Sequence, residues 1–210
     1  GVINGYFIAY GNVPPFIATL GMMSMARGLA LITTDSKNIN GFYESFKEIG
    51  RGSVLGIPIA ALIFLFMTVV IYVILERTKY GTAIYAIGGN SAAAKVSGIN
   101  VRLYTALGYV IAGACTGVAA VVLTSRMLSG NPSVGNAYEM DAITCVILGG
   151  ASFSGGTGKV VNTLFGAFIL GILVNGMTML QIDSNLQSVV KGAVIVVAVF
   201  LDARKRRDGA

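Results

Sequence analysis

Long apolar runs with almost no internal charge dominate the hydropathy pattern of this chain. A helix needs about 20 residues to cross the ~30 Å hydrocarbon layer of a bilayer. Four runs reach that length, and each predicts a transmembrane helix: Pro14–Thr34, Val54–Leu75, Tyr104–Ser125 and Val160–Gln181. The pattern therefore predicts an all-α fold, namely a polytopic transmembrane helix bundle.

Three further apolar runs are shorter than these four. Val2–Tyr10 follows no charged segment and no cleavage site, so it is not a signal peptide and is interpreted as the end of a helix that starts upstream. Leu186–Leu201 lies near the lower limit for a span, and Lys191 near its start is long enough to reach outward to the membrane surface. Ala142–Gly150 is too short to cross alone. It continues into a glycine-rich break, so we expect a short broken or re-entrant segment there.

Composition agrees with a membrane protein and excludes several chemistries. Apolar residues make up 55% of the 210 positions and charged residues only 11%, with a mean hydropathy of +0.77, whereas soluble domains carry about 25% charged residues. The chain has no histidine, which excludes His-based triads, His-ligated metals and imidazole proton relays. Cys115 and Cys145 lie in apolar runs and are interpreted as small buried hydrophobic residues. We expect neither an enzyme nor a cofactor or metal site.

The distribution of Lys and Arg predicts the orientation in the membrane, because cytoplasmic loops are enriched in them. Nine basic residues fall on one side: Arg77, Lys79, Lys95, Arg102, Lys159, Arg204, Lys205, Arg206 and Arg207. The opposite side carries four basic residues and six acidic ones. We therefore expect a cytoplasmic C-terminus whose basic tail contacts anionic lipid. Nucleic acid is not expected as a partner, since the loops offer no folded basic surface with aromatic platforms.

The loop from Glu76 to Arg102 predicts a short capped helix. Gly88 and Gly89 break the chain before it, and Asn90 or Ser91 offers an N-cap. Small helix-forming residues follow, and Gly98 suits the left-handed position that ends a helix. The residues of this predicted element are Asn90, Ser91, Ala92, Ala93, Ala94, Lys95 and Gly98. A helix this short is marginal in water, so it is either a tight connector packed on the bundle or a helix that binds in a partner's groove.

The glycine-rich break does not bind nucleotide. A P-loop needs Gly five positions before the Gly-Lys pair and Ser or Thr after it, but Phe153 and Val160 occupy those places. The segment is interpreted as a chain reversal in which the backbone can approach its neighbours closely. Its glycines are Gly149, Gly150, Gly155, Gly156 and Gly158.

One charge lies inside a predicted span. Arg27 is costly there and calls for a partner or a cavity. We predict that Asp141 or Glu139 neutralises it, either as a structural clamp or as part of a substrate contact.

Several blocks, spread over nearly the whole chain, resemble the permease subunit of bacterial ATP-binding-cassette (ABC) sugar importers of the ribose, galactose and xylose type. They are Pro14–Gly21 with Ala26–Gly28, Tyr85–Asn90, Ser97–Val101, Tyr138–Ile143, and Gly149–Gly150 with Ser154–Gly156. The resemblance implies one transmembrane permease domain over residues 1–210 that lacks the N-terminal helices of the family.

The resemblance also implies a set of partners in the bacterial inner membrane. Asn90–Gly98 would be the cytoplasmic coupling helix that contacts a separate ABC ATPase subunit. A periplasmic sugar-binding protein would deliver the monosaccharide, and a second permease copy would complete the path. The alternatives are an ABC permease for branched-chain amino acids and a secondary transporter. The latter would need ionisable coupling residues at mid-membrane, where this chain has no carboxylate.

Overall fold

The computed structural model describes residues 1–207, and of residues 201–203 and 205–207 it describes only the backbone. The chain divides into two units, Gly1–Val70 with Lys95–Val134, and Ile71–Ala94 with the chain from Gly135 onward. The prediction of a single domain stays a prediction. The side chains of Lys205, Arg206 and Arg207 in the basic tail lie outside the described residues.

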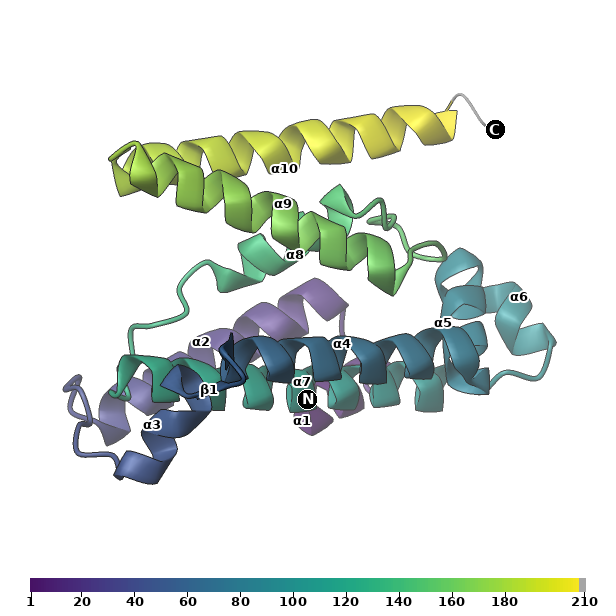
Figure 1. The fold of residues 1–210 in the computed structure, drawn as a ribbon. Coiled ribbons are helices and arrows are strands. Elements are labelled where there is room, and N and C mark those ends of the chain that lie inside the picture. Colours follow the sequence, from purple (N-terminus) through teal and green to yellow (C-terminus); the bar gives the residue numbers. More distant parts are fainter. Residues whose placement is uncertain (208–210) are drawn as a thin grey trace. The chain divides into compact units, whose positions relative to one another are not determined.

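Among residues 1–207, four helices are long and apolar enough to cross a membrane, which confirms the four predicted runs (Figure 1). They are α2 (Pro15–Thr33), α4 (Ile59–Arg77), α7 (Val101–Met127) and α9 (Val160–Met179). With 27 residues, α7 is about 40 Å long and exceeds the hydrocarbon layer. The protein is an all-α polytopic membrane protein.

In the first unit, α1 (Val2–Ala9) packs closely on α7. A Cβ built on Gly5 would lie 2.9 Å from the backbone oxygen of Ala106, and one on Gly113 would lie 2.7 Å from the Cα of Gly1. Small residues bring the two backbones together, as is usual where lipid-exposed helices associate.

The same unit contains a short helix that the sequence analysis missed. Helix α3 (Glu44–Arg51) packs on the C-terminal end of α7, where the fully buried Ser125 hydroxyl accepts a hydrogen bond from the Gly50 N–H at 2.8 Å and donates to the Phe46 carbonyl. The Arg51 Nε–H donates a further hydrogen bond to the Arg126 carbonyl at 3.0 Å. Ser125 therefore stabilises the position of α3 against α7.

The predicted start of the second span is wrong by several residues. Strands β1 (Ser53–Val54) and β2 (Ile57–Pro58) form a small antiparallel hairpin before α4 begins. Leu55 and Gly56 at its tip have positive φ, so this part of the apolar run turns instead of continuing as helix.

In the second unit, the short helix α8 (Tyr138–Leu148) packs against both α9 and α10 (Ser184–Arg207), which form the green and yellow part of Figure 1. Its 11 residues extend about 16 Å, too little to cross a bilayer. Close contact with α9 depends on Gly166, where a Cβ would lie 2.1 Å from the Cys145 carbonyl oxygen. The predicted interruption after this short apolar segment is confirmed; its re-entrant path through the membrane stays a prediction.

Candidate functional site

The predicted short helix is present and capped as expected. Helix α6 (Ser91–Val96) follows α5 (Lys79–Gly89), and Asn90 joins them. The Asn90 Oδ1 accepts a hydrogen bond from the Ala93 N–H at 3.0 Å, which identifies Asn90, and not Ser91, as the N-cap. At the other end Gly98 has a φ of +83° and donates its N–H to the Lys95 carbonyl at 3.1 Å. Local sequence therefore defines both ends of this helix.

Helix α6 has one buried side chain and an otherwise exposed surface. Ala94 is only 4% exposed, whereas Val96 is 90% exposed, and Ala92 and Lys95 are also exposed. The surface that α6 presents therefore consists of small side chains, one apolar branched side chain and one positive charge. A partner's backbone could approach this surface closely.

Helix α5, which leads into α6, was not among the elements predicted from the sequence. The chain bends sharply after α4, and a Cβ on Gly81 would lie 1.8 Å from the Leu75 carbonyl oxygen. The Thr78 hydroxyl donates a hydrogen bond to the Ile74 carbonyl at 2.6 Å and closes the end of α4. Burial raises the pKa of the Tyr80 phenol. Burial, and to a smaller extent the nearby Glu76 carboxylate, raises the pKa of the Tyr85 phenol. Both phenols therefore stay neutral at physiological pH.

The glycine-rich break forms a hydrogen-bonded turn between α8 and α9. The Ser152 N–H donates to the Thr157 carbonyl at 3.0 Å, and the Gly155 N–H donates to the Ser152 carbonyl at 3.0 Å. Gly155 and Gly156 both have positive φ, a conformation that glycine adopts without strain. Of the remaining glycines of the break, Gly149 ends α8, Gly150 also has positive φ, and Gly158 lies against Ala151.

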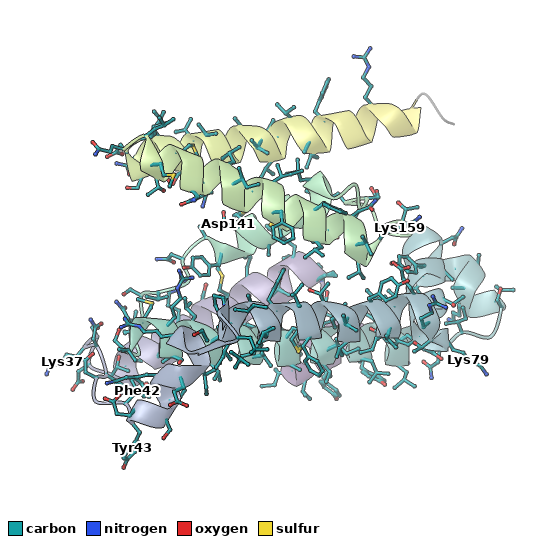
Figure 2. The ribbon with its side chains drawn as sticks, in the orientation of Figure 1. Lys37, Phe42, Tyr43, Lys79, Asp141 and Lys159 are labelled. Carbon is teal, nitrogen blue, oxygen red and sulfur yellow. The ribbon has the colours of Figure 1, made fainter. Side chains whose placement is uncertain are left out.

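Within the second unit, the glycine-rich turn contacts the glycines that precede α6. The turn at Gly155 and Gly156 lies directly against Gly88 and Gly89, the last residues of α5. Two predicted cytoplasmic lysines, Lys79 at the start of α5 and Lys159 just before α9, are labelled in Figure 2. Lys159 follows the turn in the chain, whereas Lys79 begins α5, at the end of that helix opposite to the contact.

The second unit also contains an ion pair that the sequence analysis did not predict. The Lys191 Nζ on α10 lies 3.0 Å from each carboxylate oxygen of Asp141 on α8, which Figure 2 labels. The expectation that Lys191 reaches outward to the membrane surface stays a prediction. The useful signal was the presence of opposite charges in two otherwise apolar segments, each costly without a partner.

The pairing that was predicted, of Arg27 with Asp141 or Glu139, stays a prediction. Arg27 is half-buried on α2 and belongs to the first unit, while Asp141 and the exposed Glu139 belong to the second. Among the side chains that the structure describes, no three from His, Cys, Asp or Glu gather closely enough to hold a metal ion.

The described residues thus combine four candidate membrane-spanning helices with a short, capped and exposed helix between α4 and α7. The chain belongs to the family described as "Branched-chain amino acid transport system / permease component", which matches residues 1–199.

Its curated relatives include permeases named for sugars. It is 46% identical to the ribose import permease protein RbsC of Bacillus subtilis over 96% of this chain and 63% of that protein. It is 37% identical to the D-allose transport system permease protein AlsC of Escherichia coli, over 96% and 62%. It is also 37% identical to the galactose/methyl galactoside import permease protein MglC of Escherichia coli, over 98% and 63%. The chain thus spans less than two thirds of the length of these relatives. No solved structure gives a significant match.

Proposed function

We propose that this chain is a membrane-spanning permease subunit of an ATP-driven ABC importer for a monosaccharide. The observation that carries the proposal is the sequence identity of 37–46% with permeases named for ribose, allose and galactose import. The family description names branched-chain amino acids, which keeps an amino acid importer as the second candidate.

In this proposal α6 is the element that contacts a separate ATPase subunit. Support comes from its surface, because Ala92 and Val96 are exposed and neither side chain is long enough to hold a partner at a distance. Lys95 adds a positive charge suited to an acidic residue beside the partner's groove. The cap at Asn90 and the stop at Gly98 keep this surface in helical form, so the partner need not order it on binding.

The other partners follow from the same assignment. A soluble sugar-binding protein delivers the substrate from the periplasm, and a second permease copy completes the translocation path in the inner membrane. ATP binding drives alternating access only if the ATPase subunit binds the inward-facing and outward-facing states with different affinities. The excess of Lys and Arg on the side predicted to carry α6 supports, in this scheme, a cytoplasmic location for that side and for the C-terminus.

Co-purification tests the contact at α6. The complete gene product is expressed with its candidate ATPase subunit and isolated from membranes, and the two are expected to elute together. Ala92→Arg adds a long charged side chain to the exposed face of α6 without lowering helix propensity, so it is expected to abolish the association. Thr82→Arg, at an exposed position on α5, is the matched control and leaves the association unchanged. Association that survives Ala92→Arg contradicts the role proposed for α6.

Substrate class is tested in proteoliposomes that contain both subunits and the binding protein. Uptake of labelled ribose that is inhibited by unlabelled allose or galactose, but not by leucine, supports a sugar importer. Uptake of labelled leucine, but not of labelled ribose, favours the amino acid importer. Uptake that persists without the ATPase subunit contradicts an ABC mechanism and favours a secondary transporter.

A further inference from the structure

Two segments far apart in the sequence touch through backbone alone within the second unit. A Cβ built on Gly88 would lie 2.4 Å from the Gly156 nitrogen, and one on Gly156 would lie 2.8 Å from the Cα of Gly89. One on Gly155 would lie 3.1 Å from the Gly88 carbonyl oxygen. Any side chain at Gly88 or Gly156 would therefore separate the end of α5 from the glycine-rich turn.

The turn on one side of this contact is firmly held. Besides the hydrogen bonds that Ser152 makes across it, the Ser154 N–H donates to the Ser152 hydroxyl at 3.3 Å. At its base, a Cβ on Gly149 would lie 2.6 Å from the Cα of Thr163, so the end of α8 and the start of α9 are in backbone contact. A displacement of the turn therefore displaces both helices.

The segment on the other side leads directly into α6. Gly89 is the last residue of α5, and Asn90 is both its C-cap and the N-cap of α6. The Asn90 N–H also donates to the Ala86 carbonyl at 3.0 Å, which ties the start of α6 to α5. No flexible linker separates α6 from the glycine contact.

We propose that Gly88, Gly155 and Gly156 form a rigid joint, called the glycine joint, that passes the displacement of α6 to α8 and α9. The inference rests on the proposed contact between α6 and an ATPase subunit. Closely packed backbones have no rotamers to absorb a displacement, so they transmit it. The Asp141–Lys191 ion pair extends the connection to α10.

A pair of adjacent alanine substitutions tests the joint in the assembled transporter. Gly88→Ala places a methyl group against the turn, whereas the same change at Gly89 meets open space, since no atom lies within 4 Å of its Cβ. Gly88→Ala is expected to keep the ATPase subunit bound but to lower sugar uptake by roughly tenfold. ATP hydrolysis is expected to lose its stimulation by the loaded binding protein. Gly89→Ala is expected to behave as the unmodified protein, and equal effects of the two changes would overturn the joint.

A distance measurement decides the question if Gly88→Ala fails to accumulate. After the two native cysteines are replaced, spin labels are attached to the substitutions Thr82→Cys and Phe153→Cys. Thr82 is exposed on α5, and Phe153 is 70% exposed in the turn. The joint predicts the same distance between labels in the nucleotide-free and ATP-trapped transporter. A changed distance overturns it. If the ATPase subunit does not bind the unmodified protein, the proposed function fails as well; if it binds and the distance changes, only the joint fails.

Discussion

Removing one partner of the Asp141–Lys191 ion pair should destabilise the contact between α8 and α10. Lys191→Met keeps most of the apolar length of the side chain but removes its charge, and Asp141→Asn keeps the shape of the carboxylate. The Lys191 Nζ lies 3.0 Å from both Asp141 oxygens, and the two side chains are 26% and 32% exposed. Each single change therefore leaves a largely covered charge without its partner.

The exposed fractions of these two side chains determine how large the expected loss of stability is. Exposed ion pairs contribute about 0–1 kcal/mol, and removing one partner from a fully buried pair costs about 3–5 kcal/mol. Side chains that are about three-quarters covered fall between these limits, so each single substitution should lower the free energy of unfolding by about 2 kcal/mol. The double variant should cost less than the sum of the two, with a coupling energy of about 1–2 kcal/mol.

The assay is reversible unfolding in mixed micelles, followed by circular dichroism as the fraction of SDS rises, for the unmodified protein, both single variants and the double variant. The charge swap Asp141→Lys with Lys191→Asp should recover part of the stability. If the losses of unfolding free energy in the two single variants simply add up in the double variant, the ion pair does not couple the two residues energetically. If Arg27→Glu is rescued by Asp141→Lys, the pairing predicted from the sequence is supported instead.

Three further substitutions test local contacts. Ser125→Ala removes a fully buried hydroxyl that bonds two backbone groups of α3, and should lower the free energy of unfolding by about 1–3 kcal/mol and speed amide exchange in α3. Gly166→Ala places a Cβ 2.1 Å from the Cys145 carbonyl oxygen and should cost about 1–3 kcal/mol in thermal unfolding, whereas Gly171→Ala, which meets no atom within 4 Å, should cost little. Asn90→Ala removes the cap of α6, should cost about 1 kcal/mol of helix stability and should weaken co-purification of the ATPase subunit, with Asn90→Asp as the variant that retains the cap.

The sequence by itself determined the features that depend on neighbouring residues. Span positions follow from the thickness of the hydrocarbon layer, because that thickness fixes how many consecutive apolar residues a helix needs to cross it. This number does not depend on the helix's neighbours. The ends of α6 follow from Asn90 and Gly98 for a similar reason, because a cap is a hydrogen bond between residues three positions apart and a stop is the φ of one residue.

Only the tertiary structure decided which distant segments meet. The spanning helices are apolar on every side, so their hydropathy does not indicate which face packs against protein and which against lipid. From the sequence, Asp141 and Glu139 were both candidate partners for Arg27, whereas the register of α8 against α10 pairs Asp141 with Lys191 within its unit. The approach of Gly156 to Gly88 and the docking of α3 on Ser125 likewise depend on contacts between residues far apart in the chain, which no local pattern encodes.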